Sequence, residues 1–419
     1  MLTIVRTAAG LSQLDLGTML GWSQSQVARV EAGQRDTLFD VRELLRVIDT
    51  LDMPREALAP LLLGTPDATL SSGTDRQEND DRMDRRTFTT GLLATIGFGA
   101  GLDHVQVPER VDLAHVRYLQ AGADRLRQRD QQVGGATLVR DGLRQYHRSR
   151  RMLEESDFVE PVGRALVSAS GQLAYRVGWL AYDAGDQRLA RDLYSQALLL
   201  SQESDDTALS IMALQGMTLQ SVFLARRDER PGIARQAIRT AIRASELARH
   251  ERTPRLHALL AAREAIAYAA VGDESGYRAA ISRAYRELDA GVSAEDPTWL
   301  QFVIPAELRV AEAKGRIYLG DPAAAVRLYE ESLAETDLSP RNRLNYRAQR
   351  AAALALSGEH DAAVSEGMAI LPELEQQVAS PRTLSELRPV RDAAERVGNE
   401  EFCSRWDAAM GHGSSNANV

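Results

Sequence analysis

Residues 11–35, LSQLDLGTMLGWSQSQVARVEAGQR, contain two short helix patterns joined by a glycine turn. Ser12 is a favourable N-cap for a helix over 13–20, because its hydroxyl can accept a hydrogen bond from a backbone N–H of the first turn. Ser23 is in the same position relative to a second helix over 24–32. A glycine, which readily adopts the left-handed conformation that ends a helix, follows each predicted helix: Gly21 and Gly33.

The apolar residues of the two predicted helices recur at helical spacing. Leu16 and Leu20 lie on one face of the first helix, and Val27 and Val30 lie on one face of the second, so the two faces can pack together. Amide, hydroxyl and guanidinium groups are left on the outside of the pair: Gln13, Gln24, Ser25, Gln26 and Arg29.

The order Gly-Leu-Ser-Gln, Leu-Gly-x-Ser and Val-x-Arg-x-Glu-x-Gly resembles the Cro/C1-type (XRE) helix-turn-helix family. The resemblance covers residues 1–64 and implies a five-helix DNA-binding domain. Its first helix is expected to be short, because only residues 2–9 precede Gly10. Gly17 replaces the alanine often seen where the two helices touch, a position that needs a small side chain.

The resemblance implies that the second helix of the pair lies in the major groove of DNA. The residues expected at base edges are Gln24, Ser25, Gln26 and Arg29. The residues expected near phosphates are Ser12, Gln13, Ser23 and Arg35. A glutamine amide can pair with adenine and an arginine with guanine, each worth about 1–3 kcal/mol of discrimination. The alternative is that this polar face is only solvated. A carboxylate near phosphates is unfavourable, so Glu31 is expected to pair inside the domain with Arg6.

Composition limits the possible functions. The net charge of −9 argues against strong non-specific DNA affinity, so we expect a homodimer on a palindromic operator. A single cysteine, Cys403, and scattered histidines offer no metal-ligand spacing, so no metal site or other cofactor is expected. A reducing compartment, the cytoplasm, is expected. No nucleophile-base set or phosphate-binding loop is apparent, which argues against an enzyme.

Residues 65–108 are predicted to be a linker, since most of the segment is polar and lacks apolar periodicity. Its second part, 85–102, begins with Arg85-Arg86-Thr87-Phe88 and resembles a twin-arginine export signal. The internal position and an apolar run shorter than the roughly 20 residues of a membrane span favour a buried or docking helix instead.

From residue 109 onward the sequence reads as consecutive helices with recurring turn signals. Short turn motifs follow one another at intervals of 42, 45, 48 and 38 residues, beginning at Gly185-Asp186, Arg227-Asp228, Gly272-Asp273, Gly320-Asp321 and Gly358-Glu359. The sequence around the first and fourth motifs resembles tetratricopeptide (TPR) repeats. Stacked helix pairs of this kind bury one continuous core and form a curved inner surface.

The predicted fold is therefore all-α. Its parts are a five-helix Cro/C1-type domain (1–64), a linker with an apolar helix (65–108), a right-handed α-solenoid of TPR-like helix pairs (109–410) and a disordered tail (411–419). Residues 109–155 would form an extra first pair around Gly134-Gly135, and 381–410 a C-terminal cap.

The combination of these parts resembles actinobacterial transcription regulators with TPR repeats. Its layout is also similar to the peptide-responsive quorum-sensing regulators of Gram-positive bacteria, in which asparagines of inner helices hold the peptide. That likeness suggests Asn342, Asn345 and Gln349 as ligand contacts. Two functions stay open: a homodimeric regulator whose DNA binding responds to a peptide, small molecule or protein, and a protein-binding scaffold that the DNA-binding domain tethers.

Overall fold

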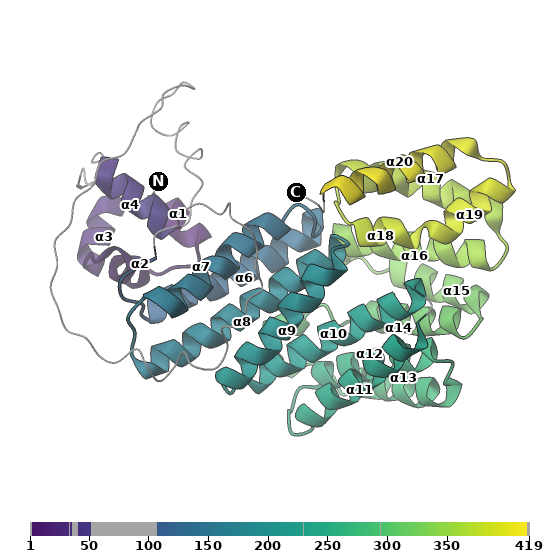
Figure 1. The fold of residues 1–419 in the computed structure, drawn as a ribbon, viewed down its shortest axis with the longest axis horizontal. Coiled ribbons are helices and arrows are strands. Elements are labelled where there is room, and N and C mark those ends of the chain that lie inside the picture. The colour runs from purple at the N-terminus through teal and green to yellow at the C-terminus, as the bar shows by residue number, and fades with distance from the viewer. Residues whose placement is uncertain are drawn as a thin grey trace. The chain divides into compact units, whose positions relative to one another are not determined.

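The computed structural model describes residues 2–32, 34–35, 41–51, 107–228, 230–293 and 295–416. These residues form helices and no β-strand, so the predicted all-α class is confirmed for them. The apolar helix expected within 85–102 and the fifth helix expected before residue 64 lie outside the described residues. The chain folds into two compact units (Figure 1): Met1–Ala121 with His147–Leu166, and Gly122–Tyr146 with Val167–Val419.

The first unit begins with short helices. They are α1 (Leu2–Ala8), α2 (Gln13–Leu20), α3 (Gln24–Glu31) and α4 (Val41–Thr50). The first helix is short, as the position of Gly10 predicts. The unit also includes the beginnings of α6 (Leu113–Val133) and α8 (Glu160–Asp183) and most of α7 (Val139–Glu155).

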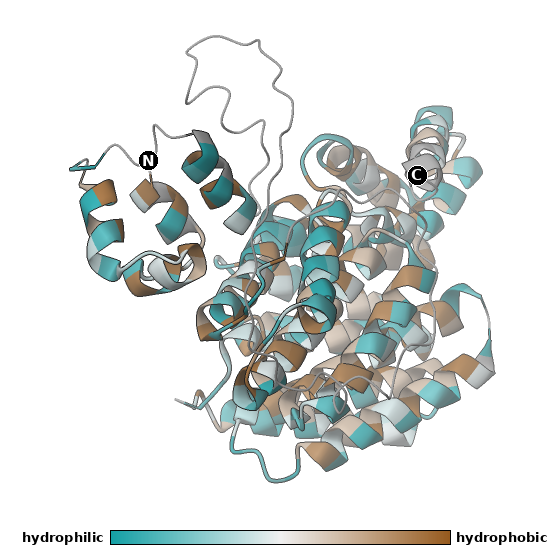
Figure 2. Cartoon of the chain, turned by 60° about the vertical axis from the view of Figure 1, so that its left-hand side comes forward, coloured by the Kyte–Doolittle hydropathy of each residue, from teal (hydrophilic) through white to brown (hydrophobic). Residues whose placement is uncertain are grey.

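The second unit continues with helices that follow one another along the chain. They are α9 (Gln187–Glu203), α10 (Thr207–Arg227), α11 (Pro231–Leu247), α12 (Pro254–Ala270), α13 (Glu274–Asp289), α14 (Pro305–Tyr318), α15 (Pro322–Leu333), α16 (Pro340–Leu356), α17 (His360–Gln376), α18 (Pro381–Glu386), α19 (Arg388–Arg396) and α20 (Glu400–Asn416). Figure 2 shows hydrophilic and hydrophobic residues mixed along these helices, as expected when one face of a helix is buried.

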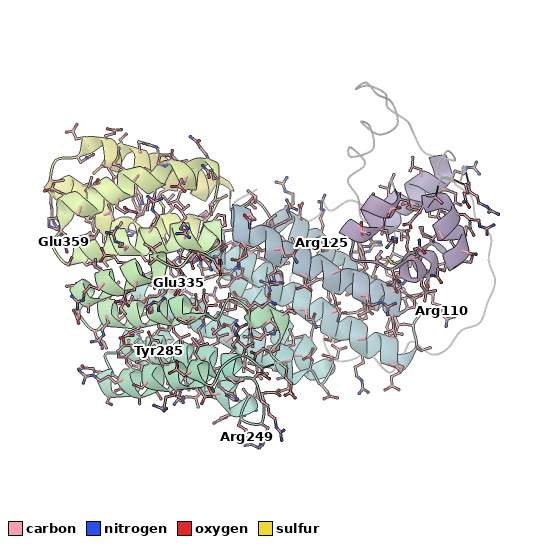
Figure 3. The ribbon with its side chains drawn as sticks, turned by 180° about the vertical axis from the view of Figure 1, so that it is seen from behind. Arg110, Arg125, Arg249, Tyr285, Glu335 and Glu359 are labelled. Carbon is pink, nitrogen blue, oxygen red and sulfur yellow. The ribbon has the colours of Figure 1, made fainter. Side chains whose placement is uncertain are left out.

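The predicted Gly-Asp turns lie between the helices of a pair. Gly185 has a φ of +88° and Asp186 caps α9, accepting a hydrogen bond of 2.9 Å from the Leu189 N–H. The same geometry recurs before α13 and α15, and Glu359 occupies the corresponding position before α17 (Figure 3). A glycine followed by a capping carboxylate therefore both ends one helix and starts the next.

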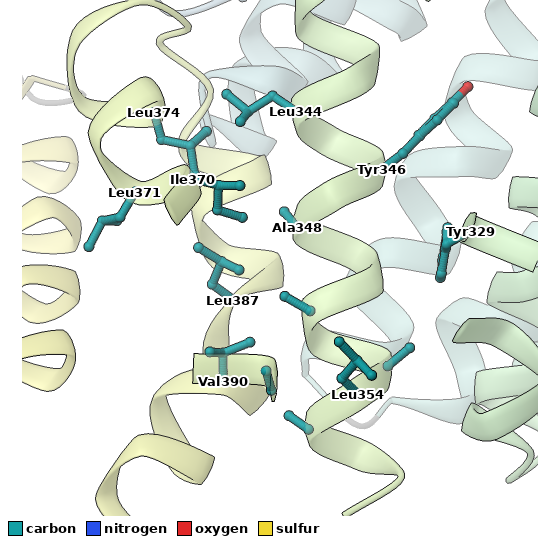
Figure 4. Packing of buried hydrophobic residues seen from close by; sticks show 14 of the residues in the cluster. Tyr329, Leu344, Tyr346, Ala348, Leu354, Ile370, Leu371, Leu374, Leu387 and Val390 are labelled. Atoms are coloured by element: carbon teal, nitrogen blue, oxygen red, sulfur yellow. The ribbon is translucent and has the colours of Figure 1, made fainter. Parts of the chain in front are cut away.

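Helices α12 and α16 are buried on more than one side. Helix α12 contacts α10, α11, α13 and α14, which explains why charged Arg263 and Glu264 are buried among its alanines and leucines. In Figure 4, Leu344 and Ala348 of α16 face the neighbouring C-terminal helices, whereas Tyr346 extends to the opposite side, toward Tyr329.

The beginning of the second unit is bonded to a segment near its end. The Ala379 N–H donates to the Val133 carbonyl at 2.8 Å, and the Ala136 N–H donates to the Ala379 carbonyl at 3.1 Å. In an open array of repeats each repeat contacts only its neighbours. Here residues about 240 positions apart in sequence pair directly, so the residues just before the predicted C-terminal cap contact the beginning of the array.

Helix α20 continues to Asn416, so residues 411–416, predicted to belong to a disordered tail, are helical. Glycine and serine are poor helix formers, but no proline interrupts this segment, and buried Phe402 and Trp406 anchor the earlier turns.

Among the described helices, only α10 is long and apolar enough for its composition to match a membrane span. Two thirds (67%) of the most apolar stretch of α10 is buried inside the protein, so packing within the core explains the composition of this helix.

Candidate nucleic-acid interface

Local hydrogen bonds determine where α2 and α3 begin. The Ser12 hydroxyl accepts from the Asp15 N–H and the Asp15 carboxylate accepts from the Ser12 N–H, both at 3.1 Å, which forms a capping box. The Ser23 hydroxyl accepts from the Gln26 N–H at 3.2 Å at the start of α3. Gly21, with a φ of +67°, ends α2. The predicted bounds of α2 are confirmed, and α3 ends within one residue of its predicted end; Gly33 lies outside the described residues.

The apolar faces of the two helices meet as the spacing predicts. Leu16, Leu20 and Val27 are fully buried, and Val30 is nearly so. Gly17 lies at the closest approach, because a Cβ built on it would come within 2.7 Å of the Trp22 carbonyl oxygen. The backbone at Gly17 and the backbone at Trp22 therefore approach so closely that even an alanine at position 17 would require one of them to move.

The opposite face of α3 is polar and exposed. The exposed residues of the predicted contact set are Ser12, Ser23, Gln24, Ser25, Arg29 and Arg35, whereas Gln13 and Gln26 are half-buried. The Arg29 Nε donates to the Ser25 carbonyl at 3.1 Å, so its guanidinium lies along the surface of α3. The structure thus places Gln24, Ser25 and Arg29 on the accessible surface of α3, whose N-terminal N–H groups favour phosphate.

Glu31, the only carboxylate on α3, is neutralised from inside the domain. It accepts a hydrogen bond from the Arg6 Nε at 2.6 Å and one from the Gln13 amide at 2.8 Å. Burial alone would raise the pKa of Glu31, but the hydrogen bonds from Arg6 and Gln13 hold it below its ordinary value. The predicted pairing of Glu31 with Arg6 is confirmed, and Gln13 faces Glu31.

Residues 2–61 match a family model described as a helix-turn-helix domain. No curated protein matches the chain. The match supports a DNA-binding regulator with DNA as a partner, and the matched segment includes α2 and α3.

The helix-turn-helix domain is bonded to α6 and α7 within the first unit. Arg117 of α6 pairs with the Asp15 carboxylate, and Arg148 of α7 donates to the Thr50 carbonyl at 3.1 Å. Burial would raise the pKa of Asp15, but the hydrogen bonds from Arg117 and Ser12 lower it. The capping carboxylate of α2 thereby also joins the domain to the chain that follows the linker.

The predicted ligand contacts on α16 are placed differently from one another. Asn345 and Gln349 are buried and hydrogen-bonded to each other; the Asn345 amide also donates to Thr383, and the Gln349 amide oxygen accepts from Tyr329. Asn342 is half-buried near the N-terminus of the helix, where its N–H donates to the Ser339 hydroxyl. Ligand binding by these three residues stays a prediction.

Sequence reasoning did not anticipate a buried ionic cluster in the second unit. The Asp183 carboxylate accepts hydrogen bonds from Arg382 at 2.8 Å and from the Gly135 N–H at 2.9 Å, and Asp130 lies 3.5 Å from Arg341. The aspartates and arginines come from helices far apart in sequence. No local motif could have paired them.

Proposed function

We propose that this chain is a sequence-specific transcriptional regulator that reads DNA bases with α3. The observation that carries the proposal is the exposed surface of Gln24, Ser25 and Arg29 on a helix whose other face is buried against α2. Glutamine and arginine are the side chains that pair bidentately with adenine and guanine in the major groove. The internal pairing of Glu31 with Arg6 supports the same reading, because it offsets the negative charge of α3.

Charge supports binding as a homodimer to a palindromic operator. The chain carries a net charge of −9, and the proposed reading surface offers only Arg29 and Arg35 as exposed cations. Phosphate neutralisation by one copy is therefore weak, and two copies on half-sites about 34–36 Å apart would add their contacts. The expected Cro/C1-type character of the domain leads to the same arrangement.

We propose that the helical array that follows is a TPR-like solenoid and that it modulates DNA binding. A peptide, small molecule or protein bound there would act by favouring one arrangement of the dimer. The hydrogen bonds that join the helix-turn-helix domain to α6 and α7 support a mechanical link between the two functions. The proposal includes a cytoplasmic location and a role that is not enzymatic.

The test starts by sequencing the genomic DNA fragments that the purified full chain retains, with and without extract of its host. The retained site is then used to compare the wild type with Arg29→Ala and with Arg188→Ala, a matched control that removes an exposed arginine of α9. Arg29→Ala should weaken binding by about 5- to 150-fold and relax preference at one base pair, as the loss of about 1–3 kcal/mol requires. Arg188→Ala should bind like the wild type.

Two results would contradict the proposal. Equal affinity of Arg29→Ala and wild type at the retained site would remove α3 as the reading helix. A chain that retains no fragment, but forms a stable complex with another protein irrespective of DNA, would instead be a scaffold that uses its helix-turn-helix domain as a tether.

A further inference from the structure

Buried contacts fix the helix-turn-helix domain to the helices that follow the predicted linker. The Tyr118 hydroxyl of α6 donates to the Leu51 carbonyl, and the Arg148 guanidinium of α7 donates to the Thr50 carbonyl at 3.1 Å. Both carbonyls lie at the C-terminal end of α4, where the helix dipole favours a cation. The Tyr118 and Arg148 side chains are buried, so these two contacts hold the domain in place within the first unit.

Arg117, the residue before Tyr118, makes a different kind of contact. Its guanidinium pairs with the Asp15 carboxylate, but the Arg117 side chain stays 51% accessible, whereas that of Asp15 is 10% accessible. An ion pair with an exposed partner adds little to stability, so docking does not depend on it. Asp15 is the one acceptor that Arg117 has within the described part of the chain, and the guanidinium therefore keeps N–H groups for a further acceptor.

Arg117 lies beside the helix that is expected to cross the DNA backbone. In a helix-turn-helix domain the second helix of the pair enters the major groove and the first crosses the backbone. The first helix here is α2, and Asp15 lies in its first turn, three residues after exposed Ser12. An uncompensated Asp15 carboxylate would repel the phosphates at this place. Arg117 neutralises it, as Arg6 neutralises Glu31 on α3.

The docked arrangement leaves the proposed reading surface open. Gln24, Ser25 and Arg29 of α3 are exposed in the presence of α6 and α7. DNA can therefore reach α3 without separating the domain from these helices, and the buried contacts of Tyr118 and Arg148 then keep Arg117 beside α2.

We infer that Arg117 of α6 contacts a DNA phosphate next to the first turn of α2, so that the DNA contact surface extends beyond the helix-turn-helix domain. The partner is the backbone of duplex DNA, and the contact is independent of base sequence. The inference rests on the proposed function for the orientation of α2. It adds a third exposed cation to Arg29 and Arg35 in a chain whose net charge is −9.

The test compares the full-length wild type with Arg117→Gln and Arg278→Gln by fluorescence anisotropy on the retained operator. Arg278 of α13 is also exposed and also pairs with one carboxylate, that of Glu274, so its replacement removes the same charge far from the domain in sequence. Each phosphate contact contributes about 0.9 to the slope of log affinity against log salt concentration. Arg117→Gln should lose about 0.9 of this slope per bound chain, and Arg278→Gln should keep the wild-type slope.

The same reasoning gives the size of the effect. The loss of affinity of Arg117→Gln relative to the wild type should be about threefold larger at about 50 mM salt than at about 200 mM salt for each bound chain. The loss should be equal on the operator and on an unrelated duplex, with base preference unchanged, because a phosphate contact carries no sequence information.

Asp15→Asn distinguishes a phosphate contact from a purely structural ion pair. Asparagine still caps a helix but has no charge, so this variant releases Arg117 and removes a negative charge beside the backbone. Asp15→Asn should bind the operator and the unrelated duplex more tightly than the wild type, whereas loss of a required structural pair would weaken binding. Circular dichroism checks the fold of each variant. Arg117→Lys, which keeps the charge, should retain most of the wild-type slope and carries the comparison if Arg117→Gln does not fold.

The outcomes separate this inference from the proposed function. A folded Arg117→Gln with the wild-type slope, or weaker binding by a folded Asp15→Asn, overturns the contact and leaves α3 as the reading helix. If Arg29→Ala keeps the base preference of the wild type while Arg117→Gln loses slope, the backbone contact stands and α3 is not the reading helix. A chain that binds no duplex overturns both.

Discussion

Replacing Asp183 with asparagine tests whether the buried ionic cluster holds the two ends of the second unit together. The carboxylate is fully buried and accepts hydrogen bonds from Gly135, Ser380 and Arg382, with Arg341 3.7 Å away. Asparagine has nearly the same shape but no charge. Asp183→Asn therefore leaves the buried Arg382 guanidinium without its anion.

The magnitude follows from burial. Removing one partner of a buried ion pair costs about 3–5 kcal/mol, and asparagine keeps one acceptor oxygen, so we expect about 3 kcal/mol. For a unit of this size each kcal/mol lowers the unfolding midpoint by about 2–4 °C, which gives a fall of roughly 6–12 °C.

Asp130 in the same cluster should behave differently. One of its oxygens has no hydrogen-bond partner among the described residues, and burial raises the pKa of Asp130, with Arg341 opposing that shift. Its charge is thus poorly compensated in the folded protein, so Asp130→Asn should cost only about 1 kcal/mol. Asp192→Asn, a half-buried aspartate of α9, serves as the matched control and should unfold like the wild type.

Thermal unfolding followed by circular dichroism measures all three variants. Burial would raise the pKa of Asp183, but Arg382 and Arg341 hold it below its ordinary value. The stabilisation by the Asp183 charge is therefore complete above the unfolded pKa and is lost as pH falls through the folded pKa. The difference between wild type and Asp183→Asn should therefore persist from pH 7 to about pH 4 and narrow below that. A midpoint for Asp183→Asn within the spread of Asp192→Asn, or a larger loss for Asp130→Asn, would refute this reasoning.

Three further changes have expected outcomes. Gly17→Ala should accelerate hydrogen exchange in α2, because the new Cβ would meet the Trp22 carbonyl at 2.7 Å and cost about 1–3 kcal/mol, more than the roughly 1 kcal/mol gained in helix propensity; unchanged exchange would contradict this. Gly185→Val should lower the unfolding midpoint, since a φ of +88° costs a β-branched residue about 1–3 kcal/mol, and an unaltered midpoint would show that the turn can rearrange. Glu31→Gln should weaken the hydrogen bond to Arg6. Because the pKa of Glu31 is lowered in the folded domain, the stability of the wild-type domain should decrease as pH falls below about 4.5. Unfolding measured as a function of pH should show this decrease for the wild type and not for the variant.

The parts of the fold that depend on neighbouring residues could be predicted from the sequence. The bounds of α2 follow from Ser12 and Gly21, and the turn before α9 follows from Gly185-Asp186. Each of these signals acts within one helical turn. The pairing of Glu31 with Arg6 needed one more step, namely that a carboxylate on the proposed reading helix would be repelled by phosphates.

Interactions between distant segments could not be predicted in this way. Asp183 was visible as part of a repeat-like motif, but nothing near it in sequence indicates that Arg382 neutralises it. The hydrogen-bond partners of Asn345 and Gln349 on α16 show the same limit, because Thr383 and Tyr329 belong to other helices.

The inner helices show why the partners of buried charges could not be predicted from the sequence. In α12, the adjacent charges Arg263 and Glu264 are flanked by alanines, leucines and an isoleucine, so the sequence does not mark one helix face as interior. The structure shows that Gln215 of α10 and Glu307 of α14 compensate the charge of Arg263. A sequence can therefore show that a charge within a buried pattern needs compensation, whereas only the packed helices show which residues supply it.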